Sequence, residues 1–266
     1  MHQEETDTKI INYDIDSILL DDESRKPNAF FNIYKLNILI AGGSGSGKSS
    51  YIIKLLLNKI IDFDAIILLA PNETIKSGLY KNLINKYKDI FGDDKLMMIF
   101  NLSEEYKGLD EFKKMGPGIV MFNGLPLFND IFELKNELEL NNLVIIFDDF
   151  ISLLNRKQWP IYYEFIHNSS RLNAVLISSC QDIKNIPPNI RNSYTVIILF
   201  VNYLTISNIK TLIKNTVNVI ISNEQLDYLI NYIKNSENKH EPLILIGGDC
   251  PFDKKIIYDN HYINFD

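Results

Sequence analysis

The stretch NILIAGGSGSGKSSYIIKLLL, from Asn37 to Leu57, decides how this chain folds. An apolar run of strand length enters a glycine-rich loop, and a second run with apolar residues at helical spacing leaves it. The loop GGSGSGKS matches the pattern G-x-x-x-x-G-K-[ST] through Gly42, Gly47 and Lys48-Ser49. A glycine–serine linker that matches by chance would lack the flanking strand and helix. The stretch therefore predicts a strand, a phosphate-binding loop and a helix.

Each residue type in this loop suits the binding of phosphate. Glycines allow a positive φ, so successive backbone N–H groups can turn inward around an anion. The helix that begins at Lys48 adds its positive N-terminal end. Lys48 can reach the β- and γ-phosphates, and the Ser49 hydroxyl can bind Mg²⁺. We therefore expect a nucleoside triphosphate to be bound by Gly42, Gly43, Ser44, Gly45, Ser46, Gly47, Lys48, Ser49 and Ser50.

A second apolar run supplies two carboxylates. The segment LVIIF, residues 143–147, reads as a strand that is buried on both faces, and Asp148 and Asp149 follow it directly. Ligands in an open α/β sheet lie at the carboxyl ends of the strands. We assign Asp148 to the Mg²⁺ shell, and Asp149 to orienting or deprotonating the attacking water. The alternatives are that Asp149 caps a helix or is a solvated loop acid, and that Asp148 is a bystander. Two carboxylates here favour hydrolysis over transfer to an acceptor.

The next predicted strand also ends in polar residues, which run from Ser178 to Gln181. A glutamine at this place can reach the γ-phosphate or the attacking water; the alternative is a loop glutamine that faces solvent. Cys180 is interpreted as a space-filling residue, because no general base is near it in the sequence. His167 is interpreted as a partner of a helix dipole rather than a catalyst.

Arginine occurs only four times in the chain, at positions 25, 156, 171 and 191. An arginine that a neighbouring subunit donates can stabilise the transition state of ATP hydrolysis. Arg171 is the first candidate for that role and Arg191 the second, followed by Arg156; the alternative for each is an ordinary surface arginine. The guanine-specific pattern Asn-Lys-x-Asp is absent, since NKII, NKYK and NKHE all lack the aspartate. ATP is therefore the expected nucleotide.

The overall composition and net charge of the chain favour some classes of protein and argue against others. With 266 residues, 46% of them hydrophobic, the chain can bury a full core. A net charge of −7 argues against a protein that coats nucleic acid through its overall charge, although a local patch or a ring of loops could still grip DNA. No segment approaches the roughly 20 apolar residues of a spanning helix, so we expect no membrane insertion. Two cysteines without metal-binding spacing suit a reducing, intracellular compartment.

Strand-like and helical segments alternate along most of the chain, which predicts a doubly wound α/β fold with a mostly parallel sheet and helices on both faces. Residues 1–32 are predicted to be an acidic lead-in that is either disordered or laid over the core. Residues 33–266 are predicted to form one domain, in which residues 205–266 add a C-terminal extension of helices and a β-hairpin. The expected strands lie in 35–41, 63–72, 95–100, 116–124, 143–147, 172–181 and 193–202, the hairpin in 241–249 and 254–260, and the helices in 48–61, 74–91, 103–116, 127–140, 158–170, 208–217 and 222–235.

Four segments in order, GGSGSGKSS, VIIFDDF, NSSRLNAVLISSCQ and IPPNIRNSY, resemble the genome-packaging ATPases of poxviruses and related large DNA viruses. That family belongs to the FtsK–HerA group of DNA translocases, and the resemblance covers roughly residues 34–205. It implies a RecA/FtsK-like P-loop NTPase fold and a homo-oligomeric ring of five or six subunits. Such a ring would hydrolyse ATP with Mg²⁺ to drive double-stranded DNA into an immature particle.

The resemblance also implies roles for single residues. Lys48 and Ser49 would bind phosphate and Mg²⁺, Asp148 and Asp149 would form the second catalytic motif, and Gln181 would sense the γ-phosphate. Arg171 would act on the site of the next subunit. Many FtsK–HerA proteins carry Glu where this chain has Asp149, so the role of Asp149 as general base is less firmly implied than that of Asp148. The implied partners are DNA and capsid or virion-assembly proteins, in the viral factory of the host cytoplasm or in the virion.

Two other functions fit a phosphate-binding loop. A P-loop kinase of a nucleoside or nucleotide would need an arginine-bearing lid, for which LLNRKQWP, residues 153–160, offers a single arginine. A nucleotide-gated assembly scaffold would bind ATP and oligomerise with negligible release of phosphate.

Overall fold

The computed structural model describes residues 10–12, 36–57, 63–92, 94–108, 117–151, 154–217, 221–236, 241–247, 256–258 and 261–263. Their strands are β1 (Ile10–Asn12), β2 (Leu36–Ala41), β3 (Ala65–Ala70), β4 (Leu96–Asn101), β5 (Gly118–Asn123), β6 (Leu143–Phe147), β7 (Ala174–Cys180), β8 (Val196–Leu199), β9 (Leu243–Ile246), β10 (Ile256–Tyr258) and β11 (His261–Ile263). These residues form one 11-stranded sheet in the order β1-β11-β10-β9-β8-β2-β7-β6-β3-β4-β5.

The sheet is parallel from β8 to β5 and antiparallel beyond β8. Strand β2 pairs in parallel with β7 and β8, β7 with β6, β6 with β3, β3 with β4 and β4 with β5. The strands β3 and β6 of this part are apolar on both faces, as expected where a sheet is covered on both sides. The predicted α/β fold with a mostly parallel sheet is confirmed.

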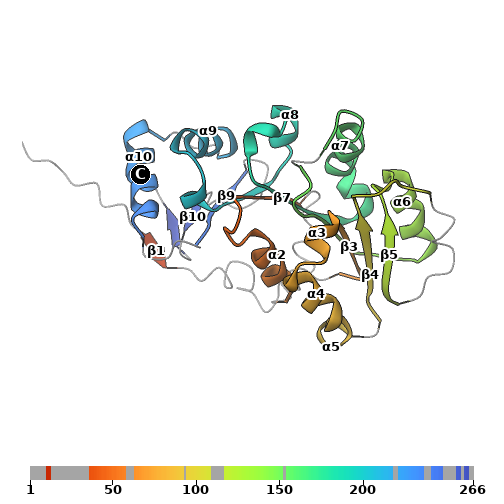
Figure 1. Ribbon diagram of the computed structural model, residues 1–266. Helices are drawn as coiled ribbons and strands as arrows, with labels where there is room; N and C mark the ends of the chain where they lie inside the picture. Colours follow the sequence, from red (N-terminus) through yellow and green to blue (C-terminus); the bar gives the residue numbers. More distant parts are fainter. Residues whose placement is uncertain are drawn as a thin grey trace, which may run out of the picture.

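Helices cover both faces of the sheet (Figure 1). One layer contains α2 (Lys48–Leu57), α3 (Asn72–Ile75), α4 (Gly78–Asn85) and α5 (Tyr87–Phe91), and the other contains α6 (Phe128–Glu137), α7 (Trp159–Asn168), α8 (Pro188–Arg191), α9 (Ile206–Thr216) and α10 (Asn223–Lys234). Three 3₁₀ helices, η3 (Ser169–Leu172), η4 (Ile183–Asn185) and η5 (Val201–Tyr203), flank β7 and β8.

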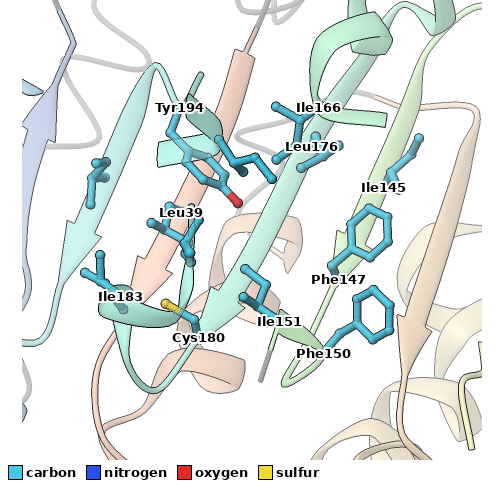
Figure 2. Packing of buried hydrophobic residues seen from close by; sticks show 14 of the residues in the cluster. Leu39, Ile145, Phe147, Phe150, Ile151, Ile166, Leu176, Cys180, Ile183 and Tyr194 are labelled. Carbon is cyan, nitrogen blue, oxygen red and sulfur yellow. The ribbon is translucent and has the colours of Figure 1, made fainter. Parts of the chain in front are cut away.

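Two apolar clusters hold the layers on the sheet. Alternate residues of each central strand point to opposite faces, so in β2 Ile38 and Ile40 pack toward α2 while Leu39 packs toward the layer of α6 and α7. Figure 2 shows Leu39 and Phe147 within the cluster on the side of α6 and α7. In this cluster the rings of Phe147 and Tyr162 meet edge to face, with centroids 4.9 Å apart. Burial on both faces fixes the register of these strands, because a slip by one residue would exchange the two clusters.

A buried asparagine connects the second layer to the sheet. The Asn37 side-chain amide at the start of β2 donates to the Ile166 and Ser193 carbonyl oxygens, each at 3.0 Å, and its oxygen accepts from the Ser169 hydroxyl. Every polar atom of this fully buried amide group therefore has a partner, as burial demands. Ser169 belongs to the segment NSSRLNAVLISSCQ and has a structural role.

The predicted terminal hairpin extends the main sheet. Strand β9 pairs antiparallel with β8, β10 pairs with β9, and β11 pairs with β10. Strand β1 from the lead-in then pairs antiparallel with β11 at the far edge. The strands β9, β10 and β11 thus continue the sheet on the side of β8.

Two predicted helices differ in the structure. The helix expected at 103–116 is wrong over residues 103–108, which are non-helical, and 109–116 lie outside the described residues. Ser103 does not begin a helix of its own, because its hydroxyl accepts from the backbone N–H of Asn72 at the start of α3 and its own N–H donates to the Asn101 side-chain oxygen. The helix expected at 74–91 is divided into α3, α4 and α5, with the first break at Lys76 and Ser77, directly before Gly78, a poor helix former.

Candidate nucleotide-binding site

The loop between β2 and α2 has the backbone that the glycine pattern predicts. Gly45 and Gly47 have φ of 73° and 102°, in the region that glycine adopts without strain. Gly42 is required by space, because an added Cβ would lie 2.8 Å from the Phe200 Cβ. The Gly42 N–H also donates to the Cys180 carbonyl, which joins the start of the loop to the end of β7.

Lys48 is held inside the loop. Its Nζ donates to the Gly42 carbonyl at 2.9 Å and to the Gly43 carbonyl at 3.0 Å, and the residue is only 7% exposed. Three N–H donors on one ammonium group can exchange these carbonyl acceptors for phosphate oxygens without a large movement. Ser49 is half-buried and Ser50 exposed, and both stand in the first turn of α2, directly after the loop.

Strand order brings the three sequence-predicted polar residues together. Strand β7 lies between β2 and β6, so the residues that follow β7 stand between the phosphate loop and the residues that follow β6. Gln181 follows β7, and Asp148 and Asp149 follow β6. All of them therefore lie at the carboxyl edge of the parallel sheet beside Lys48, where an open α/β sheet binds its ligand.

Asp148 is fully buried and its carboxylate has two hydroxyl donors. The Tyr80 hydroxyl from α4 donates to Oδ2 at 2.7 Å, and the Ser179 hydroxyl from β7 donates to Oδ1 at 2.5 Å. Burial raises the pKa of Tyr80 well above its usual value, and the negative charge of Asp148 adds to the effect, so this hydroxyl stays a donor. A buried carboxylate with two dedicated hydroxyl donors is a fixed part of this edge of the sheet.

Asp149 has a left-handed backbone that turns the chain at the end of β6. Its φ is 55°, which an aspartate tolerates better than most side chains. Its N–H donates to the Ser179 hydroxyl at 2.9 Å, and its Oδ1 accepts from the Gln181 amide at 3.1 Å. Asp149 caps no described helix, and Gln181, although exposed, is directed at Asp149 rather than only at solvent.

Ser179 and Tyr80 are members of the site whose roles pattern reasoning missed. Ser179 stood in the polar run from Ser178 to Gln181, and that run was the signal for it. Tyr80 had no signal, because it lies 68 residues before Asp148 in the sequence. A single serine hydroxyl thus connects both aspartates, and one tyrosine from the opposite layer fixes the first of them.

The donor set fits a magnesium ion that arrives with phosphate. The described residues contain no group of three or more His, Cys, Asp or Glu side chains able to hold a metal alone. Mg²⁺ usually takes one or two protein oxygens together with waters and substrate phosphates. The Ser49 hydroxyl and the Asp148 carboxylate are suitable oxygens, since each Asp148 oxygen retains acceptor capacity beyond its one hydroxyl.

Arg171 and His167 lie before β7, away from this edge, whereas Cys180 lies at the edge itself. Arg171 lies in η3, before β7 begins, with its guanidinium 5.8 Å and 5.2 Å from the ring centroids of Phe128 and Phe132. His167, in the last turn of α7, lies against the Tyr163 ring. Cys180 is buried at the end of β7, and burial raises the pKa of its thiol to about 12, which agrees with a space-filling role.

Comparison with known proteins supports the fold. No protein-family model matches the sequence, and no curated protein matches it. The chain is similar to the genome packaging NTPase B204 from Sulfolobus turreted icosahedral virus 2: in the complex with ATP-gammaS the identity is 18%, the TM-score is 0.53, and the match covers 88% of this chain and 99% of that one. The sulfate complex of B204 matches with 16% identity, a TM-score of 0.50 and coverage of 88% and 98%. At this identity the likeness shows the fold, and this chain has the α/β fold of a P-loop NTPase.

Proposed function

We propose that this protein is a Mg²⁺-dependent ATPase that moves double-stranded viral DNA into a capsid or immature virion. One observation carries the enzymatic part of the proposal. One strand, β7, separates the phosphate loop with Lys48 from the buried Asp148, whose carboxylate accepts two hydrogen bonds. Asp149 and Gln181 are hydrogen-bonded to each other beside it. This arrangement provides separate groups to bind phosphate, to bind a metal ion and to direct the attacking water.

Each group has a distinct task in hydrolysis. Loop N–H groups and Lys48 bind the phosphates and offset charge as it develops on the leaving oxygens. A magnesium ion held by Ser49 and Asp148 would supply further positive charge to offset the charge of the phosphates. Asp149 accepts a proton from, or orients, the attacking water, and Gln181 fixes Asp149 through its amide. Because this edge has a water-directing carboxylate, hydrolysis is favoured over transfer.

The motor part of the proposal rests on the resemblance to poxvirus-type packaging ATPases of the FtsK–HerA group, together with the fold. B204, whose fold is similar, is described as a genome packaging NTPase. By this analogy the chain acts as a homo-oligomeric ring of five or six subunits, with duplex DNA and capsid or virion-assembly proteins as partners. Its place would be the viral factory in the host cytoplasm, and the virion. No helix among the described residues is long and apolar enough to span a membrane.

Steady-state ATP hydrolysis, measured with and without long double-stranded DNA, tests the proposal. We expect stimulation by duplex DNA in the wild type, and a loss of about 100-fold or more in turnover for Asp149→Asn with ATP binding retained. Asparagine adopts a positive φ as readily as aspartate, so the variant changes the charge and preserves the backbone. Turnover indifferent to duplex DNA would count against a motor. Phosphoryl transfer to a nucleotide acceptor would indicate a kinase, and ATP-dependent oligomerisation without phosphate release would indicate a scaffold.

The arginine in trans is a separate part of the proposal. Strand β7 separates Arg171 from Gln181, and its seven residues span about 20 Å, so Arg171 cannot serve the site of its own chain. We expect Arg171→Ala to abolish turnover with ATP binding spared, and mixing with Lys48→Ala subunits to restore part of the activity. Arg156→Ala, at an exposed residue, tests the third candidate in parallel. Absence of rescue in a confirmed mixed oligomer would reject Arg171 and leave Arg191 or Arg156.

A further inference from the structure

The two sides of the phosphate loop are chemically different, and this sets the direction in which a nucleotide must lie. Strand β2 has β7 on one side and β8 on the other. Asp148, Asp149 and Gln181 follow β6 and β7, so the terminal phosphate, whose bond is broken, belongs on that side. The sugar and base of the same nucleotide must then extend toward the end of β8.

The end of β8 packs directly against the loop. Phe200 is buried beneath it, with its ring atoms 3.7 Å and 3.9 Å from the position of a Cβ added at Gly47 and its ring edge to face with Tyr51 on α2. The chain then turns through η5 beside the loop. A Cβ added at Gly43 would lie 3.3 Å from the Tyr203 Cβ and 3.6 Å from its Cδ1, so the Tyr203 side chain lies against the loop backbone.

Tyr203 keeps part of its ring open to solvent while its backbone is firmly held. The residue is 37% exposed. Its N–H donates to the Phe200 carbonyl at 3.0 Å, and the next residue, Leu204, accepts through its carbonyl from Lys234 Nζ of α10 at 3.3 Å. A partly exposed tyrosine with a hydrogen-bonded backbone beside the phosphate loop offers a planar base a ring for stacking.

We infer that Tyr203 is the residue on which the nucleobase of ATP stacks, an inference that rests on the proposed ATPase function. Stacking on a single aromatic face adds affinity with little choice of base, because every base has a π-face. Tyr203 therefore makes the site bind a nucleotide more tightly than bare polyphosphate, which the loop alone would bind. Selection of adenine over other bases is left to groups other than this ring.

Isothermal titration calorimetry with a non-hydrolysable ATP analogue and with inorganic tripolyphosphate, both with Mg²⁺, tests the inference. Tyr203→Ala retains the Cβ that faces Gly43 and removes the ring. We expect it to weaken binding of the analogue about 5- to 150-fold, with tripolyphosphate binding unchanged. Tyr203→Phe should bind both ligands as the wild type does. Tyr228→Ala on α10, which removes a 65% exposed tyrosine remote in sequence from the loop, is the matched control and should change neither.

Each other outcome overturns the inference. Equal weakening of both ligands by Tyr203→Ala would show that Tyr203 only supports the loop, and no weakening of either would show that the base lies elsewhere. In both cases the proposed ATPase stands if the wild type hydrolyses ATP. A wild type that binds neither ligand would overturn the ATPase and the inference together.

A fluorescence measurement gives an independent readout. The chain has one tryptophan, Trp159, so wild type serves as the baseline for Tyr203→Trp. We expect the emission of the new indole to change with the ATP analogue and not with tripolyphosphate, since only the base can stack on it. An identical response to both ligands would contradict the assignment.

Discussion

At the scale of single residues, the site depends on how Asp148 is held. A buried carboxylate is costly unless its oxygens accept hydrogen bonds, and here the hydroxyls of Tyr80 and Ser179 donate to them. Tyr80→Phe preserves the ring and removes one donor. We expect about a tenfold drop in turnover, a higher Mg²⁺ concentration at half-maximal activity, and a loss of about 1.5–3 kcal/mol in the free energy of unfolding. Activity measured across a Mg²⁺ titration, with urea unfolding, gives all three.

The neighbouring helix provides a matched control for this prediction. Tyr87 on α5 is equally buried, and its hydroxyl has no hydrogen-bond partner among the described residues. Tyr87→Phe removes an unsatisfied polar atom, so it should preserve the Mg²⁺ dependence and stability. If Tyr80→Phe and Tyr87→Phe behaved alike, the hydrogen bond to Asp148 would have no part in positioning the metal ligand.

At the scale of elements, α10 shows how one cap supports a helix. The Ser222 side chain accepts from the Gln225 N–H, and the Gln225 side chain accepts from the Ser222 N–H, which forms a capping box. Ser222→Ala should lower the free energy of unfolding by about 1 kcal/mol in urea titrations. Ser77→Ala is the control, because Ser77 is the N-cap of α4 and its side chain makes no capping hydrogen bond. An equal cost for both substitutions would mean that the box contributes nothing specific.

At the scale of the whole molecule, the core contains tyrosines that resist ionisation. Burial raises the pKa of Tyr80, Tyr87, Tyr162 and Tyr194 above the usual value of about 10. A raised pKa in the folded state adds stability that is fully present below pH 10, because only above that pH does the unfolded chain release protons that the folded chain retains. The free energy of unfolding should therefore fall as pH rises from about 10 toward 11.

Urea unfolding between pH 8 and pH 11 measures this dependence. Each such tyrosine contributes a slope of at most about 1.4 kcal/mol per pH unit. Tyr87→Phe removes one of them, so its slope above pH 10 should be shallower than that of the wild type. Stability that is level up to pH 11 would contradict the expectation that these hydroxyls stay protonated in the folded protein.

Local patterns were sufficient for the strand, loop and helix of the predicted phosphate-binding site. Positive φ at Gly45 and Gly47 is a property of glycine itself, and the helix after Lys48 follows from the spacing of its apolar residues. The buried strand before Asp148 was likewise readable from five apolar residues in a row. The helix predicted from Ser103 is wrong over residues 103–108. The Ser103 hydroxyl instead accepts a hydrogen bond from the backbone N–H of Asn72 at the start of α3, a partner that the local sequence does not reveal.

The glycine-rich loop, the alternation of strands and helices and the polar residues at the strand ends can all be read from the amino-acid order alone, since they depend on backbone preferences and on periods of two and 3.6 residues. Three features appear only in the folded protein: β7 lies between β2 and β6, Tyr80 donates to Asp148, and Tyr203 lies against Gly43. Strand order and these contacts join residues far apart in the chain. They are determined by the packing of two apolar clusters on opposite faces of the sheet, which no local window of sequence contains.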